Sequence, residues 1–169
     1  MIYTLRHLRK LLRTTIGCCE MDQSIEKKIT ERARRDGIEN YVVGALITRN
    51  CNILLVERPK DDFMGGVYEI PGGQVEEGET LAEALYREVM EETELKVREI
   101  RKYIGHFDYG SEDDVKTRQF NFLVEIHEPF QIRLHEHVNY AWVNSSGLSQ
   151  YHVSDSMREV LNAYWQEKC

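Results

Sequence analysis

The chain has 169 residues, a formal net charge of −7 and 41% hydrophobic residues. A chain of this length suits one domain that buries about 70% of the surface its unfolded chain exposes. The acidic balance argues against a protein that coats nucleic acid. No apolar run approaches the roughly 18 residues that a membrane-spanning helix needs. We therefore expect a small soluble protein without a nucleic-acid or membrane partner.

The first twenty residues differ from the remainder. Residues 1–19 hold four basic side chains and no acid, and their apolar residues would line one side of a helix. This pattern is typical of an organelle transit peptide or of a membrane-surface helix. The alternative, which we favour, is an extension with little structure ahead of Met21. Residues 1–20 are therefore separated from a single domain over residues 21–169.

The cysteines give a second indication of the compartment. They are Cys18, Cys19, Cys51 and Cys169, and they show neither zinc-type spacing nor the pattern of a disulfide framework. A reducing compartment is the default for such a chain. We therefore expect a cytoplasmic protein.

Regular elements are predicted from Ser24 onward. Ser24 can cap a short helix that ends at Gly37. β-branched and aliphatic runs predict strands over 41–48, 53–56 and 67–70, with a hairpin turn at 50–52 between the first two. Further strands are predicted over 97–109, 115–126 and 139–143, followed by a final helix behind a capping box from Ser156 to Glu159. Strands and helices in this order predict a mixed sheet with helices on its faces.

One helix is marked more strongly than the others. Thr80 and Glu83 form a T-x-x-E capping box at its start. Leu81, Leu85 and Val89 recur at helical spacing and predict its inward side. We expect its acidic side to face outward.

The acidic side of this helix is unusual. Glu88, Glu91 and Glu92 would project together, and like charges at this spacing destabilise an isolated helix unless a cation lies among them. Oxygen ligands at this density suit Mg²⁺ or Mn²⁺. The Pro71-Gly72-Gly73 turn before the helix lets the backbone approach a ligand, so Gly72 could offer a carbonyl to the metal.

Residues 72–95 resemble the Nudix box, G-x5-E-x7-R-E-U-x-E-E-x-G-U, in which U is aliphatic. The positions in register are Gly73, Glu79, Arg87, Glu88, Val89, Glu91, Glu92 and Leu95. Glu94 departs from the family's glycine, which usually ends the helix in a left-handed conformation. The resemblance implies the α/β/α sandwich of MutT-like Nudix hydrolases, with Mg²⁺ or Mn²⁺ as cofactor and a nucleotide as substrate.

The family's site residues can be placed on this chain. The resemblance implies that Glu92 is an essential metal ligand, and we assign Glu88 and Glu91 to the same metal. It also implies that Glu136 is a general base or an extra ligand, although a solvated loop glutamate is an equal alternative. The catalytic machinery would then comprise Glu91, Glu92 and Glu136.

Three further residues complete the expected box. Arg87 is expected to support this machinery by bridging Glu83 and Glu91, since guanidinium suits carboxylate pairs. Glu79 is expected to accept backbone N–H groups of the loop, as the family's equivalent does, and Gly73 belongs to the turn.

The substrate side of the site is less marked. In MutT-like members a residue at the position of Arg58 reaches the phosphate or base of the substrate, although a solvated arginine is an even alternative. Glu69 could approach the metal cluster. His135 and His137 flank Glu136, but no third zinc-type ligand lies nearby, so we reject a zinc site. Several strand aromatics could stack on a base or belong to the core: Tyr103, Phe107, Tyr109, Phe120 and Phe122.

Three classes of function remain open. The first is a metal-dependent hydrolase of a nucleoside diphosphate linked to another group. The second is a Nudix-fold binding module without turnover, which would require damaged carboxylates. The third is an isomerase of allylic diphosphates, which requires a cysteine in the active site. By elimination we favour a nucleoside triphosphate, including a non-standard one, as substrate, with ADP-ribose or a dinucleoside polyphosphate as alternatives. A homodimer is compatible with the sequence.

Overall fold

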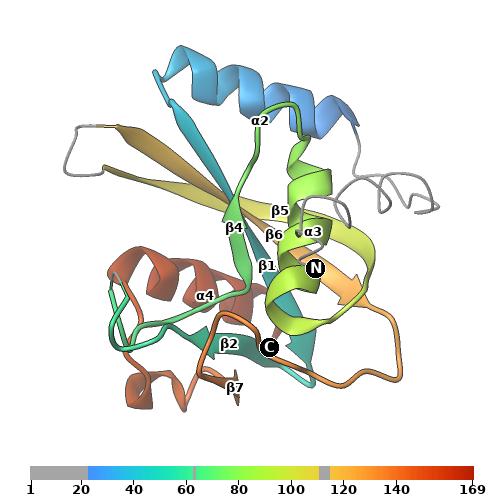
Figure 1. Cartoon of the computed structure of the whole chain (residues 1–169), viewed down its shortest axis with the longest axis vertical. Coiled ribbons are helices and arrows are strands. Elements are labelled where there is room, and N and C mark those ends of the chain that lie inside the picture. Colours follow the sequence, from blue (N-terminus) through green and yellow to red (C-terminus); the bar gives the residue numbers. More distant parts are fainter. Residues whose placement is uncertain (1–22, 63, 111–114) are drawn as a thin grey trace, which may run out of the picture.

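The computed structural model describes residues 23–62, 64–110 and 115–169. The leader expected at residues 1–20 lies outside the described residues, so its separation from the domain stays a prediction. The elements in chain order are α2 (Gln23–Arg35), β1 (Asn40–Arg49), β2 (Asn52–Glu57), β3 (Tyr68–Glu69), β4 (Gly72–Gln74), α3 (Leu81–Thr93), β5 (Val97–Gly110), β6 (Lys116–Ile126), β7 (Asn139–Val143), the 3₁₀ turn η2 (Leu148–Gln150) and α4 (Asp155–Lys168) (Figure 1).

The strands form one mixed sheet, as expected. Its order is β3-β2-β1-β6-β5, with β4 paired to β1 and β7 paired to β2. β1 and β6 run parallel, whereas β1 is antiparallel to β2 and β4, and β5 is antiparallel to β6. The short strand β4 was not predicted, because its Gly-Gly-Gln sequence has no strand propensity. β4 forms because its residues pair with residues 42–44 of β1.

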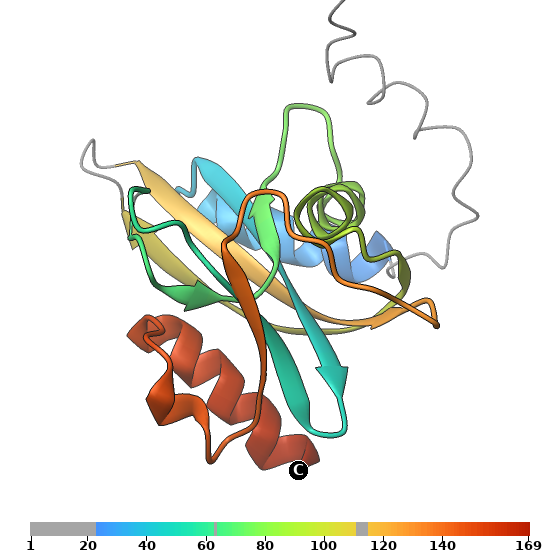
Figure 2. The same ribbon diagram turned by 60° about the horizontal axis from the view of Figure 1, so that its bottom comes forward.

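Helices cover both faces of the sheet (Figure 2). Along β1, Ala45 and Ile47 belong to a core cluster that includes residues of α2 and α3, whereas Leu46 belongs to a second cluster with residues of α4. Since alternate strand residues point to opposite faces, α2 and α3 lie on one face and α4 on the other. The predicted α/β/α sandwich is confirmed.

The capping signals were read correctly for α3. Thr80 Oγ1 accepts from Glu83 N at 3.1 Å, and the Glu83 carboxylate accepts from Thr80 N at 2.9 Å. The helix ends at Glu94, whose φ of 57° and ψ of 12° are left-handed. Replacing the motif glycine by glutamate has therefore not moved the helix end, and a side chain occupies a conformation that favours glycine.

Two other helix starts were read incorrectly. The start of α4 is capped by Ser154, whose hydroxyl accepts from Met157 N, and Ser156 lies inside the first turn. The Ser156–Glu159 pattern misled because a capping box requires an extended residue at its start, which the backbone supplies at Ser154. Ser24 likewise lies within α2, which begins at Gln23. The predicted end of α2 is confirmed by Gly37, whose φ of 75° is left-handed.

The cysteine expectation also needs correction. Cys51 lies in the predicted hairpin turn between β1 and β2, and it forms a disulfide with Cys169 across a Cα separation of 6.1 Å. Trp165 of α4 donates to Cys51 O at 2.9 Å. The pairing was missed because 118 residues separate the two cysteines in sequence, and only the packing of α4 on the sheet brings them together. No helix in the described ranges has the length and apolarity to cross a bilayer.

Replacing Glu94 by glycine should stabilise the domain. Glycine adopts the left-handed conformation without the steric cost of a side chain, so we expect Glu94→Gly to raise the free energy of unfolding by up to about 1 kcal/mol. The exposed ion pairs of Glu94 with Arg133 and His135 contribute little to offset this. Urea denaturation measures the effect. Glu94→Gln is the control, because it loses the ion pairs and keeps the left-handed side chain; equal stabilisation by both variants would contradict the backbone explanation.

Candidate functional site

Arg87 lies at the centre of a group of carboxylates on α3 and in the preceding loop. Its Nε and Nη2 donate to the two oxygens of Glu79 at 2.8 and 2.7 Å. Its Nη1 donates to Glu88 and, at 3.3 Å, to Glu91, and Nη2 also reaches Gln74 O at 2.9 Å. The predicted bridge to Glu91 is present, but Glu83 is engaged in the helix cap instead. The guanidinium therefore holds the loop and two helical carboxylates together.

Glu79 behaves as the sequence indicated. Besides accepting hydrogen bonds from two nitrogens of Arg87, it accepts one from the backbone N–H of Glu76 in the loop, at 3.0 Å. Its side chain is only 10% exposed, so this bidentate pair is largely shielded from water and is stronger than a surface ion pair. Glu79 thereby fixes the loop that leads from β4 into α3.

Two glycines allow α3 to approach the sheet. A Cβ at Gly73 would lie 2.7 Å from Glu88 Oε1, and one at Gly72 would overlap Val43 O of the paired strand β1. Backbone therefore excludes a side chain at Gly72, whereas a side chain at Gly73 would require the Glu88 carboxylate to move. Gly72 also donates its N–H to Glu92 Oε2 at 2.9 Å. The contact seen at Gly72 uses this amide, and the metal role expected of its carbonyl stays a prediction.

The acidic side of α3 does not face outward, which corrects the sequence prediction. The side chain of Glu92 is 6% exposed and that of Glu88 13%, whereas Glu91 is 31% exposed. The error arose because an apolar stripe was read as the only buried side of the helix. β4 and the loop before β7 cover the acidic side as well, so carboxylates lie partly inside the protein.

Burial changes how these carboxylates titrate. Desolvation raises the pKa of Glu92 to about 9. The hydrogen bond from the Gly72 N–H opposes this shift, and repulsion from Glu88, Glu69 and Glu136 adds to it. Desolvation also raises the pKa of Glu88, although Arg87 opposes it. Each of these groups would be stabilised in its ionised form by a nearby cation.

The fold brings further acids from distant parts of the chain to the same place. Glu136, in the exposed loop before β7, repels both Glu88 and Glu92. Glu69 of β3 repels Glu92. These two residues were selected from the sequence as companions of the helical acids, and the structure places both close enough to interact with them.

The donor set fits a hard divalent cation in its chemistry. All the acids offer oxygen, and their mutual repulsion and raised pKa values indicate negative charge that protein cations offset only in part. In the described part of the chain, no three His, Cys, Asp or Glu side chains are already arranged to hold a metal ion. Glu88 and Glu91 are turned toward Arg87, and Glu92 toward Gly72, so metal binding would require their carboxylates to turn.

Arg58 follows β2 at the edge of this acidic region. Its Nη1 donates to Glu69 Oε1 at 2.9 Å and its Nη2 to Asp62 Oδ2 at 2.6 Å. Arg58 and Glu69 both act electrostatically on Tyr109, whose pKa is raised mainly by burial of its hydroxyl. The structure therefore joins Arg58, Glu69 and Tyr109, which come from three separate strands or their ends.

The predicted aromatic residues divide into two groups. Phe120 and Phe122 are fully buried, and Tyr103 packs against Phe122 with ring centroids 5.5 Å apart, so these three belong to the core. Phe107 and Tyr109 lie near one another at 6.1 Å, and Tyr109 is 45% exposed. Phe107 packs partly against the second core cluster, so Tyr109 is the most exposed of the five and the best placed to stack on a base.

His137 is a residue whose place sequence reasoning missed. Its side chain is 5% exposed and lies between Glu69 and Glu92. His135, by contrast, is exposed and contacts Glu94 at 2.9 Å. The two histidines therefore contact different carboxylates. The H-E-H pattern was the available signal, but its spacing suggests only a zinc motif.

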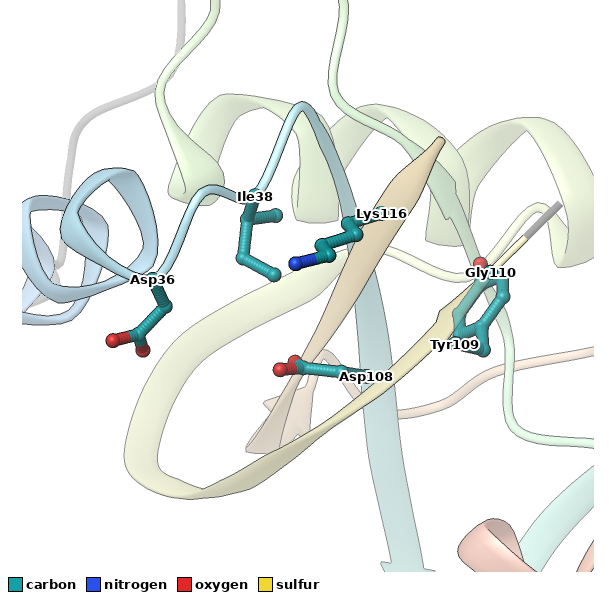
Figure 3. A pocket seen from close by; sticks show the side chains of 6 residues that line it. All are labelled: Asp36, Ile38, Asp108, Tyr109, Gly110 and Lys116. Atoms are coloured by element: carbon teal, nitrogen blue, oxygen red, sulfur yellow. The ribbon is translucent and has the colours of Figure 1, made fainter. Parts of the chain in front are cut away.

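A hollow of about 440 Å³ lies between the end of α2 and the adjacent ends of β5 and β6, and Tyr109 is among the residues that line it. Figure 3 shows the Lys116 ammonium reaching toward Ile38, with the carboxylates of Asp36 and Asp108 turned toward the same space. Both aspartates are paired with the buried guanidinium of Arg118. None of the acids around Arg87 lines this hollow, so it is distinct from the carboxylate cluster.

Comparisons with known proteins agree with this geometry. Residues 39–164 match the family model of the NUDIX domain. The CTP pyrophosphohydrolase of Escherichia coli is 28% identical over 127 residues, which cover 73% of this chain and 89% of that protein. The ADP-ribose pyrophosphatase of Methanocaldococcus jannaschii is 37% identical over 71 residues, covering 42% and 41% of the two chains. The solution structure of the E. coli ORF135 protein aligns with a TM-score of 0.67 and 25% identity over 79% of this chain and 94% of that one.

The metal-free protein should lose stability as the pH rises. Burial raises the pKa of Glu92 to about 9 in the folded protein, so Glu92 binds its proton more tightly there than in the unfolded chain, where the pKa has its ordinary value of 4.5. The contribution of Glu92 to the free energy of unfolding is therefore full below about pH 4.5 and is lost as the pH rises toward 9. Urea denaturation at a series of pH values in a chelator should show this decline, and Glu92→Gln should flatten it. Glu77→Gln, at an exposed position of the same segment, should leave the decline unchanged; a flat profile in the wild-type protein would contradict the assignment.

Proposed function

Because this chain belongs to the NUDIX family of hydrolases, we propose that it uses Mg²⁺ or Mn²⁺ to cleave a nucleoside triphosphate, standard or modified, into a nucleoside monophosphate and pyrophosphate. The observation that carries the proposal is the convergence of Glu69, Glu88 and Glu136 on Glu92, whose pKa is raised first by burial and then by repulsion from these acids. Such a cluster is costly without a cation and suits one that accompanies a phosphate substrate.

We assign the metal to Glu88, Glu91 and Glu92, with the Gly72 carbonyl as a further ligand. A bound divalent ion neutralises charge on the phosphates and makes a water more nucleophilic. Arg87 and Glu79 hold the loop and α3 together. The carboxylates therefore start close to the positions in which they would bind the metal. Arg87 thus supports catalysis through the carboxylates it holds.

Glu136 is the proposed general base. Glu88 and Glu91 are engaged by Arg87, and Glu92 accepts the Gly72 amide. Glu136 lies in an exposed loop and yet interacts with this cluster. A carboxylate with access to water and proximity to the ligands is suited to remove a proton from the attacking water.

The substrate is expected to extend from the acids toward Arg58. Arg58 carries a guanidinium for a phosphate oxygen or a base, and Glu69 orients it through the 2.9 Å ion pair. Tyr109, beside both, offers a partly exposed ring on which a base can stack. The triphosphate chain would then span from Arg58 to the carboxylates of α3.

Coverage favours the triphosphate over ADP-ribose. The relative named for CTP aligns with 89% of its own length, whereas the one named for ADP-ribose aligns with 41%. The long alignment, over 73% of this chain, necessarily includes the strands that carry Arg58 and Tyr109. ADP-ribose remains the second candidate, and a binding module without turnover is disfavoured because all the motif carboxylates are present. Nucleic acid and membrane partners are not part of the proposal, and a homodimer is compatible with it.

Activity should depend on both the divalent ion and the acids of α3. We expect a chelator to abolish turnover and Mg²⁺ or Mn²⁺ to restore it. Glu91→Gln and Glu92→Gln should each lower kcat by about a hundredfold or more, because each removes charge from the assigned metal site. Circular dichroism should show that both variants remain folded, and the exposed Glu77→Gln should retain full activity. Full turnover by either α3 variant would refute the metal assignment.

Arg58→Ala should weaken substrate use without weakening the fold. Loss of one charge-assisted hydrogen bond costs about 1.5–3 kcal/mol, so kcat/KM should fall roughly ten- to a hundredfold. A panel of nucleoside triphosphates, ADP-ribose and a diadenosine polyphosphate, with products separated by ion exchange, measures this effect and the preferred substrate.

The matched control for Arg58 is Arg101→Ala, which removes an exposed arginine of β5 that pairs with Glu99 and Glu125. It should leave kcat/KM unchanged. If ADP-ribose were the best substrate and Arg58→Ala had no effect, the triphosphate assignment would be wrong and only the family assignment would stand.

A further inference from the structure

His137 occupies a buried position between the two halves of the candidate site. Its Nε2 lies 3.4 Å from Glu69 Oε1, and its Nδ1 lies 3.8 Å from Glu92 Oε1. The side chain is 5% exposed, and Nδ1 is buried with no hydrogen-bond partner among the described residues. A buried polar atom without a partner costs about 1–3 kcal/mol, so such a position calls for an explanation.

The histidine is the middle of a chain of polar contacts. Arg58 binds Glu69 at 2.9 Å, Glu69 faces one nitrogen of His137, and the other nitrogen faces Glu92. Glu92 in turn accepts the Gly72 N–H through its second oxygen. This chain connects the proposed substrate arginine on one side with the proposed metal ligand on the other.

The distances show what the ring can do. Glu92 Oε2 is held by Gly72 N at 2.9 Å, whereas Oε1 lies 3.8 Å from Nδ1 of His137. A shift of about 1 Å would bring that pair to hydrogen-bond distance. A neutral imidazole ring donates from one nitrogen and accepts at the other, and a protonated carboxyl group can donate to the accepting nitrogen. Contact with Glu92 would fix the rotation of a carboxylate that must turn toward a metal.

We propose that His137 is a positioning residue, which orients the Glu92 carboxylate for metal binding through Nδ1 and links it through Nε2 to the Glu69–Arg58 pair. The proposal rests on the metal role of Glu92 in the proposed function and adds a residue outside the motif. Groups that hydrogen-bond to metal ligands typically contribute ten- to a hundredfold to metal affinity.

The test is the affinity for Mn²⁺ alone, measured by electron paramagnetic resonance on the full chain without substrate. His137→Asn places an amide nitrogen near the position of Nδ1, and His137→Gln places one near Nε2. We expect His137→Gln to weaken Mn²⁺ binding roughly ten- to a hundredfold, and His137→Asn to retain most of the affinity. At saturating Mn²⁺, turnover by His137→Gln should recover toward the wild-type kcat, because the ligands themselves are intact.

His135 provides the matched control. It lies in the same loop, but it is exposed and contacts Glu94 instead of the site. His135→Gln and His135→Asn should both bind Mn²⁺ as the wild-type protein does, and thermal melting of all four variants establishes that each is folded.

Two results would overturn the inference. One is wild-type Mn²⁺ affinity in His137→Gln, and the other is equal weakening in the Asn and Gln variants, which would indicate loss of packing instead of a specific Nδ1 contact. A wild-type protein that bound no Mn²⁺ would refute the proposed function itself. Failure of the proposed function is distinguishable from failure of the His137 proposal, because it would appear in the wild-type protein before any variant is compared.

Discussion

The whole acidic region depends on one guanidinium. Arg87 pairs with Glu79, Glu88 and Glu91 and also binds Gln74 O. Without a cation at this point, the like charges on α3 would repel one another at helical spacing. Arginine suits the position better than lysine, because its planar fork donates to several oxygens at once while remaining charged. The loop from β4 and the first turns of α3 are therefore held in one arrangement before any metal or substrate binds.

Around this centre the sheet supplies close packing. Gly72 and Gly73 allow β4 to pair with β1 while the carboxylate of Glu88 lies against them. The same approach buries Glu92 and raises its pKa to about 9. Burial thus makes an unpaired carboxylate unfavourable at this site and makes binding of a cation favourable. The loop before β7 completes this enclosure with an exposed acid, Glu136, and a buried histidine, His137.

Much of the fold followed from local patterns. The β1–β2 hairpin, the long strands β5 and β6, and the start of α3 at Thr80 were all predicted, because alternation, turn residues and capping boxes act over a few residues. The predictions were wrong where two similar local patterns competed and the backbone conformation favoured one of them. Ser154 was preferred to Ser156 as a cap, and β4 formed without strand propensity because β1 offered it a partner.

The sequence by itself determined the family resemblance and the residues of the acidic helix, since their spacing is local and places them on one helix whatever surrounds it. Only the tertiary structure decided that this helix buries Glu92, that Cys51 meets Cys169, and that His137 lies between Glu69 and Glu92. Those pairings join residues far apart in the chain. Their distances depend on how β3, α3 and the loop before β7 pack, which no short sequence pattern encodes.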